Sequence, residues 1–198
     1  ILFNALLTTV NPGDEVIIPA PYWVSYPDIV ALAGGTPVIV PLKEENNFDL
    51  DPDTLARYVT GKTRVIVLNS PSNPSGAVYS RAALEAVGRM AYEKGWVIVS
   101  DDMYEDLYYG EGRIPHILHT DPRLVRQTII SNGVSKSFAM TGWRIGYSVG
   151  PAEVIAAMNK IQSQSTSNPA APCQYAALAA LTGPQDFPRL LRATFLPR

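Results

Sequence analysis

Residues 64–68 read RVIVL and residues 96–100 read WVIVS, and both are continuous runs of apolar, largely β-branched residues. Such runs are typical of strands that are buried on both faces of a sheet. The first run leads into the loop NSPSNPSG, and the second leads into Asp101 and Asp102. The two runs therefore predict core strands whose carboxyl ends carry polar side chains.

Helical and extended patterns alternate on both sides of these two runs. Proline or capping residues begin the helical segments and glycine ends several of them, with Asp53 and Ser80 as expected N-caps and Gly95 as a stop. Because the strands alternate with helices, we expect an α/β doubly wound sheet that is mostly parallel. Further strands are predicted at residues 16–19, 36–42, 127–131 and 144–149, and helices at 1–10, 21–34, 53–58, 80–94, 151–162 and 173–181.

Composition describes an ordinary globular protein with room for one domain. Of the 198 residues, 46% are hydrophobic and 17% are charged, and the net charge is -2. This balance gives no electrostatic basis for a nucleic-acid partner or an anionic membrane. The single cysteine, Cys173, permits no internal disulfide, and no apolar run approaches the roughly 20 residues of a membrane-spanning helix. We expect a cytoplasmic protein.

A second stretch, SNGVSKSFAMTGWRIGYSVG at residues 131–150, contains two isolated cations, Lys136 and Arg144. A loop lysine is most often a solvated surface residue. Here, however, small residues and the large apolar side chains of Phe138 and Trp143 favour an enclosed environment. An enclosed amine loses its proton readily, and a neutral amine attacks aldehydes. The stretch therefore suggests Schiff-base chemistry at Lys136.

An aldehyde cofactor with a pyridine ring and a phosphate requires four kinds of protein group. It needs an amine for the aldehyde, a carboxylate for the ring nitrogen, donors for the ring hydroxyl and a cation for the phosphate. In open α/β sheets these groups are expected at the carboxyl ends of strands. The candidates are Lys136 for the amine, Asp101 for the carboxylate, Asn73 and Tyr104 for the hydroxyl, Arg144 for the phosphate and Trp23 for stacking on the ring.

Each candidate also has a purely structural interpretation. An aspartate at a strand end is more often a turn or cap residue, and Asn73 before Pro74 is a common turn former. Tyr104 and Trp23 could simply be buried in the core. Asp102 is expected to be a solvated or supporting group.

Other functional classes find little support in the sequence. His116 and His119 lie in a polar segment and are predicted to be surface residues, and no His, Cys and Asp grouping has metal-ligand spacing. No GxSxG elbow follows a strand, which disfavours a Ser-His-Asp hydrolase. No GxGxxG or GxxxxGK motif occurs, so dinucleotide and P-loop sites are not indicated.

The segments NSPSNPSG, SDDMYEDLYY and SNGVSKSFAMTGWRIGY, in this order, resemble the class I pyridoxal-phosphate aminotransferases of fold type I. The resemblance is to the prokaryotic-type aspartate aminotransferase subgroup in particular, and APYWVSYP and TGPQDF are similar to it too. It extends from Ile1 to about Phe187. It implies a three-layer sandwich with a mostly parallel, mixed central sheet, pyridoxal 5'-phosphate as cofactor, and a homodimer.

The resemblance also implies a role for each candidate residue. Lys136 matches the Schiff-base lysine, Arg144 the phosphate-binding arginine, Asp101 the pyridine-nitrogen aspartate, Asn73 and Tyr104 the ring-hydroxyl partners, and Trp23 the stacking aromatic. Two departures occur, with Asp102 where the family usually carries Glu and Ser137 where Ala is frequent. Neither is expected to affect the mechanism.

Members of the family have about twice this length, by resemblance. The turn that binds the phosphate through its backbone should precede Ile1, and the arginine that binds the substrate carboxylate belongs to a smaller domain made from both termini. We therefore expect residues 1–198 to be the pyridoxal-phosphate-binding large domain, as a fragment of a longer protein.

The implied activity is transfer of an amino group from an amino acid, aspartate in the first place, to a 2-oxo acid such as 2-oxoglutarate. In this activity Lys136 would hold the cofactor as an internal aldimine. Three alternatives stay open. The site could serve an aromatic, kynurenine or prephenate aminotransferase or a β-lyase; the domain could sense the cofactor in a transcription regulator; or the fragment alone could be inactive.

Overall fold

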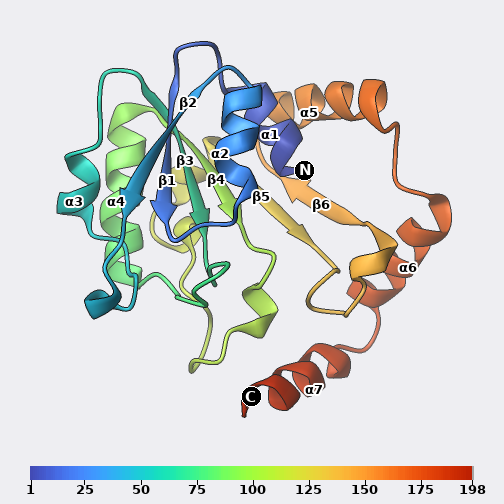
Figure 1. Cartoon of the computed structure of the whole chain (residues 1–198). Helices are drawn as coiled ribbons and strands as arrows, with labels where there is room; N and C mark the ends of the chain where they lie inside the picture. The colour runs from blue at the N-terminus through green and yellow to red at the C-terminus, as the bar shows by residue number, and fades with distance from the viewer. Residues whose placement is uncertain (198) are drawn as a thin grey trace.

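Six strands form a single sheet with the order β2-β1-β3-β4-β5-β6 (Figure 1). The computed structural model describes residues 1–197. Strands β1 to β5 are parallel, and β6 runs antiparallel to β5. The predicted α/β fold with a mostly parallel, mixed sheet is thus confirmed. The strands are β1 (Glu15–Ala20), β2 (Thr36–Pro41), β3 (Thr63–Asn69), β4 (Val97–Asp101), β5 (Thr128–Gly133) and β6 (Gly146–Val149).

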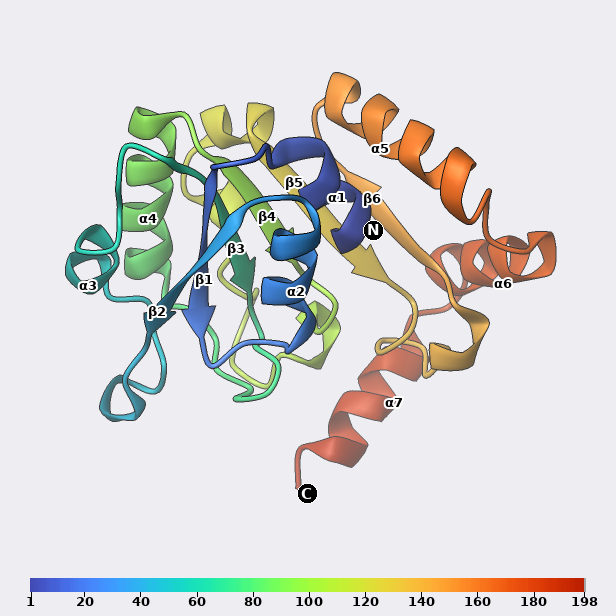
Figure 2. The ribbon, with the colours of Figure 1, turned by 45° about the horizontal axis from the view of Figure 1, so that its top comes forward.

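Helices cover both faces of the sheet and make it the middle of three layers. Figure 2 shows α1 and α2 on one face and α4 on the other. The helices are α1 (Leu2–Thr9), α2 (Ser25–Leu32), α3 (Pro52–Ala56), α4 (Arg81–Lys94), α5 (Ala152–Ser165), α6 (Ala171–Thr182) and α7 (Asp186–Phe195). Short 3-10 helices are η1 (Glu44–Asn46), η2 (Glu105–Leu107), η3 (Ile117–His119), η4 (Pro122–Arg126) and η5 (Thr141–Trp143).

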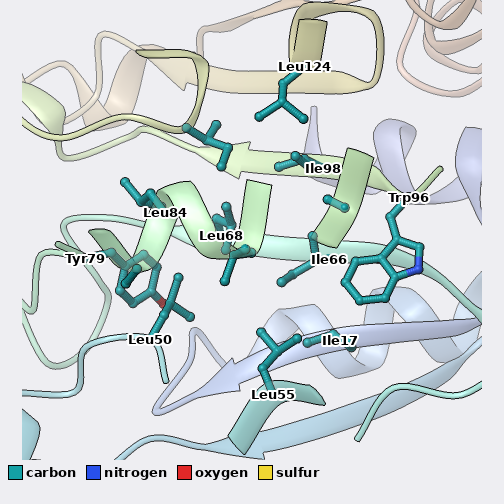
Figure 3. Packing of buried hydrophobic residues seen from close by; sticks show 14 of the residues in the cluster. Ile17, Leu50, Leu55, Ile66, Leu68, Tyr79, Leu84, Trp96, Ile98 and Leu124 are labelled. Atoms are coloured by element: carbon teal, nitrogen blue, oxygen red, sulfur yellow. The ribbon is translucent and has the colours of Figure 1, made fainter. Parts of the chain in front are cut away.

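The continuous apolar run of β3 fills two separate cores. Val65 and Val67 face the cluster under α1 and α2, whereas Ile66 and Leu68 face the cluster under α4. Successive strand side chains point to opposite faces, so a strand covered on both sides needs apolar residues at every position. Figure 3 shows the α4 side, where Ile66 and Leu68 of β3 lie between Ile98 of β4 and Ile17 of β1.

Helix α4 begins and ends at the residues that the sequence predicts. The Ser80 Oγ accepts a hydrogen bond from the Ala83 N–H at 3.1 Å, and Gly95 follows the helix with a φ of +64°. A left-handed residue at this place costs little when it is glycine. Within the helix, Gly88 lets η3 and η4 approach closely, because a Cβ there would lie 2.9 Å from the Leu124 Cδ1.

Two predicted helix starts differ from the structure. Asp51, not Asp53, caps α3, and its side chain accepts hydrogen bonds from the Asp53 N–H at 3.1 Å and the Thr54 Oγ1 at 2.5 Å. Helix α2 begins at Ser25 rather than at Pro21. The residues between them form the loop that carries Trp23, so the later start gives this indole a loop position.

Helices α6 and α7 lie beyond the edge strand β6, away from the two main cores (Figure 1). They expose several large apolar side chains, namely Tyr175, Leu178, Leu181, Phe187, Leu190 and Phe195. Among residues 1–197, no helix is both long enough and apolar enough to cross a membrane.

Candidate active site

Three neighbouring strands bring the candidate residues to one edge of the sheet. Across β3, β4 and β5 the residues Asn69, Asp101 and Ser131 are paired Cα partners, and each lies at or near the carboxyl end of its strand. The chain then continues from Asn69 toward Asn73 and from β5 toward Lys136. This edge is where open parallel sheets bind ligands.

Asp101 is the last residue of β4 and is only 6% exposed. Its Oδ2 accepts a hydrogen bond from the Tyr26 hydroxyl at 2.5 Å, and its Oδ1 accepts one from the Met103 N–H at 3.3 Å. Burial raises the pKa of the Asp101 carboxyl, and these two bonds offset part of that effect. Within residues 1–197 no lysine or arginine forms an ion pair with it. A buried carboxylate of this kind is suited to a cationic ligand.

Asn69 joins the loop that carries Asn73 to the end of β4. Its Nδ2 donates to the Asp101 main-chain oxygen at 2.9 Å, and its Oδ1 accepts from the Asn73 N–H at 2.7 Å. Asn73 and Tyr104 line the same pocket, which has a volume of about 440 Å³. The two predicted ring-hydroxyl partners are therefore brought together.

Lys136 lies in the loop that follows β5 and is half-buried. Its Nζ lies 5.5 Å from the centroid of the Tyr104 ring. The Thr141 hydroxyl donates to the Ser135 main-chain oxygen at 3.0 Å and so closes the loop around the lysine. The enclosed environment expected from the sequence is only partly present, since Trp143 is 46% exposed.

Arg144 follows η5 and lines a different pocket from Asn73 and Tyr104, beside the first residues of α1. It has a left-handed backbone with φ +53°, and its Nη1 donates to the Thr141 main-chain oxygen at 2.8 Å. The strand predicted to begin at Arg144 therefore begins later, at Gly146, as β6. Arg144 lines a second pocket of about 300 Å³ together with Ile1 and Asn4. The first turn of a helix has free N–H groups, so an arginine beside it suits an anion.

Trp23 is connected to Asp101 through Tyr26. The Trp23 and Tyr26 rings meet edge to face, with centroids 5.5 Å apart and an angle of 85° between the planes. Trp23 itself is half-buried. Both the candidate stacking residue and the candidate carboxylate thus contact the same tyrosine.

Sequence reasoning missed Tyr26 and Asn69 as parts of the site. Both belong to segments that the sequence singles out, APYWVSYP for Tyr26 and the end of the RVIVL strand for Asn69. The strand-end rule that selects Asp101 also selects the segment from Asn69 to Gly76, but it assigns no role to Asn69 itself. Nothing local to Tyr26 indicates that its hydroxyl reaches a residue 75 positions away.

Asp102 is a buried supporting group, one of the two roles expected for it, whereas the prediction of His116 as a surface residue is wrong. Asp102 is 4% exposed, and it accepts hydrogen bonds from the Ser100 hydroxyl at 2.7 Å and the His116 Nε2 at 2.9 Å. Burial alone would lower the pKa of His116, but its hydrogen bond to Asp102 and the charges of Asp102 and Glu105 raise it overall. His119 is exposed, as predicted.

The donor set fits the cofactor that the sequence indicates. A buried carboxylate that no lysine or arginine of residues 1–197 pairs with suits a protonated ring nitrogen, and the asparagine and tyrosine at one pocket suit a ring hydroxyl. An amine and an aromatic face lie nearby, and an arginine at a helix start suits a phosphate.

Comparison with known proteins gives one consistent result. The family described as aminotransferase class I and II matches residues 1–193. An aspartate/prephenate aminotransferase of Cereibacter sphaeroides is 54% identical over 200 residues, covering 100% of this chain and 50% of the relative. An aspartate aminotransferase of Geobacillus stearothermophilus is 49% identical over 197 residues, covering 100% and 49%.

Solved structures agree with these sequence relatives. The aspartate aminotransferase from Rhizobium meliloti is 46% identical, covers 99% of this chain and 49% of its own, and has a TM-score of 0.92. An aspartate aminotransferase from Thermus thermophilus is also 46% identical, with a TM-score of 0.90 over 98% of this chain and 49% of its own. The fold predicted by resemblance is confirmed, and the chain spans about half the length of the relatives it matches.

Proposed function

The chain belongs to the class I and II aminotransferases, and from this premise we propose that it binds pyridoxal 5'-phosphate for amino-group transfer. The observation that supports this most strongly is the Asp101 carboxylate, buried at the strand edge with no lysine or arginine paired to it among residues 1–197. Amino transfer is favoured by the names of the relatives over β-elimination or gene regulation.

Pyridoxal phosphate supplies an aldehyde that bonds to amines and a protonated ring that accepts electrons from the substrate. Asp101 holds the proton on the ring nitrogen through its ionised carboxylate. The Lys136 Nζ would hold the aldehyde group before substrate arrives; once the substrate amine has replaced it there, the freed Nζ would accept the proton from the substrate α-carbon and return it. This base is half-buried, and its Nζ lies 5.5 Å from the Tyr104 ring centroid.

The remaining residues bind and orient the cofactor. Asn73 and Tyr104 donate hydrogen bonds to the ring hydroxyl, and their shared pocket supports this pairing. Arg144 binds the phosphate beside the first turn of α1, where both the guanidinium and the helix N–H groups attract an anion. Trp23 covers one face of the ring.

Aspartate is the proposed amino donor, and 2-oxoglutarate is the proposed acceptor. The donor is supported by the names of the Cereibacter and Geobacillus relatives. Prephenate is a second candidate acceptor, because the Cereibacter relative is named for both compounds. Kynurenine or aromatic amino acids find no comparable support in those two names.

We propose that residues 1–198 form the cofactor-binding large domain of a longer, homodimeric and cytoplasmic enzyme. The relative lengths support the domain assignment, since the match takes in 100% of this chain but only 50% of the Cereibacter relative. The exposed apolar side chains of α6 and α7 support further packing, because large apolar surfaces on a protein usually contact another chain segment or subunit.

The experiment is an activity assay on the full-length enzyme supplied with pyridoxal phosphate, aspartate and 2-oxoglutarate. We expect glutamate and oxaloacetate to form in equal amounts and no activity in Lys136→Ala. Lys160→Ala, on α5, is the matched control and should retain activity. Ammonia in place of glutamate would instead indicate a lyase, and activity in Lys136→Ala would refute the assignment.

A further inference from the structure

The hydrogen bond between Tyr26 and Asp101 lies inside the molecule and joins two distant segments. Tyr26 comes from α2 and is 1% exposed, and its hydroxyl oxygen lies 2.5 Å from the Asp101 Oδ2. A buried tyrosine hydroxyl normally needs a partner, and many partners on the main chain would serve. Here the partner is the one carboxylate that the proposed cofactor requires.

We propose that Tyr26 is a positioning residue for the cofactor, whose hydroxyl orients the Asp101 carboxylate and keeps it ionised while its ring supports Trp23. This inference rests on the proposed function. The Tyr26 hydroxyl does not itself touch the cofactor in this proposal, and it acts through its two neighbours.

The hydrogen bond from Tyr26 orients the Asp101 carboxylate and leaves it with acceptor capacity for a ligand. Burial, together with the charge of Asp101 and the bond to it, raises the pKa of Tyr26 far above its ordinary value. The hydroxyl therefore stays protonated and donates to Oδ2. Among the residues described, 1–197, the Oδ1 receives only the longer bond from the Met103 N–H, at 3.3 Å. A carboxylate oxygen can accept two hydrogen bonds, so Oδ1 retains capacity for the ring N–H.

The same bond acts on the charge of Asp101. Burial raises the pKa of this carboxyl and the neighbouring Asp102 raises it further, whereas the bonds from the Tyr26 hydroxyl and the Met103 N–H lower it. Tyr79 and Tyr104 are the other titratable groups near Tyr26. Without the hydroxyl, Asp101 would hold its proton to a higher pH, and a neutral carboxyl would bind a pyridinium less well.

The ring of Tyr26 provides the second part of the role. It meets the Trp23 indole edge to face, with ring centroids 5.5 Å apart, and the Tyr26 N–H donates to the Trp23 main-chain oxygen at 3.1 Å. Edge-to-face pairs stabilise their own relative orientation. The Tyr26 side chain thus contacts both Asp101, the proposed partner of the ring nitrogen, and Trp23, the proposed stacking residue.

The test compares Tyr26→Phe with Tyr79→Phe in the full-length holoenzyme. Tyr26→Phe keeps the ring and removes only the hydroxyl, whereas Tyr79 is a buried tyrosine of the other core cluster. For Tyr26→Phe we expect the dissociation constant of pyridoxal phosphate to rise by about ten- to a hundredfold, the range for a lost hydrogen bond to a charged group. The pH below which affinity for pyridoxal phosphate falls, the acid limb of binding, should move to a higher value. The kcat should fall by a larger factor than the substrate KM changes. Tyr79→Phe should change none of these quantities.

A double-mutant cycle separates positioning from general packing. If the hydroxyl acts through Asp101, Tyr26→Phe should have little further effect on cofactor affinity once Asp101→Asn is present. An equal loss in both backgrounds, or an unchanged dissociation constant and pH limb in the single variant, would overturn the role of Tyr26 alone. Failure of the wild-type enzyme to bind pyridoxal phosphate at all would overturn the proposed function and this role together.

Discussion

Replacing Asn69 with alanine removes both side-chain hydrogen bonds that join the Asn73 loop to the end of β4. The Asn69 amide is 6% exposed and uses both of its polar atoms, one toward the Asp101 main-chain oxygen at 2.9 Å and one toward the Asn73 N–H at 2.7 Å. The perturbation therefore affects two candidate cofactor-binding residues at once, without touching their side chains.

The expected loss of stability follows from the burial of the two partners. Asp101 is buried, so its main-chain oxygen loses a donor that water cannot easily replace, at a cost of about 2 kcal/mol. Asn73 is half-buried, and its N–H can be partly solvated, which reduces the second loss to about 1 kcal/mol. We expect Asn69→Ala to lower the free energy of unfolding by about 3 kcal/mol.

Urea unfolding at neutral pH measures this change, as a lower midpoint with an unchanged slope. Asn168→Ala is the matched control, because its exposed amide makes a single bond to the Pro169 main-chain oxygen at 2.8 Å. The control should change the free energy of unfolding by less than about 0.5 kcal/mol. A loss in Asn69→Ala no larger than that of the control would refute the reasoning.

Three further predictions concern packing, pH and catalysis. Gly88→Ala should destabilise the protein by about 1–2 kcal/mol in thermal unfolding, because its Cβ would lie 2.9 Å from the Leu124 Cδ1; a higher Tm would contradict this. His116→Gln should lose stability mainly below its ordinary pKa of 6.5, since the raised pKa makes the protonated form stabilising. The difference in stability between the wild type and His116→Gln should vanish as pH rises through the folded-state pKa of His116. Denaturant midpoints of both proteins measured across pH test this, and a difference that stays constant with pH would contradict it. Asp101→Ala should lower kcat more than Asn73→Ala, because it removes the partner of the ring nitrogen rather than one hydrogen bond to the ring; equal losses would count against this ranking.

The elements best predicted from the sequence are those in which burial or capping restricts the residue type at each position. The runs RVIVL and WVIVS indicate strands buried on both faces, and β3 divides its residues between two cores as such a strand must. Ser80 and Gly95 locate α4 because capping depends on a few neighbouring residues. Asp101 is also located from the sequence, because it directly follows the predicted strand WVIVS and ligands bind at the carboxyl ends of such strands.

What the sequence could not show depends on contacts between distant segments. The bond from Tyr26 to Asp101 spans 75 positions, and the pairing of His116 with Asp102 brings a polar segment back against the strand end. The sequence predicts a strand that begins at Arg144, yet this residue has a left-handed backbone and precedes β6. In each case the tertiary arrangement, not local preference, decides the environment of the residue.

The central claim is that Lys136 holds the aldehyde of pyridoxal phosphate. Borohydride reduction of the full-length enzyme mixed with pyridoxal phosphate, followed by peptide mass spectrometry, tests it most directly, because reduction makes an amine-linked cofactor permanent. We expect the added mass on the peptide that contains Lys136 and its absence from the corresponding peptide of Lys136→Ala. Modification confined to other lysines, or none at all, would contradict it.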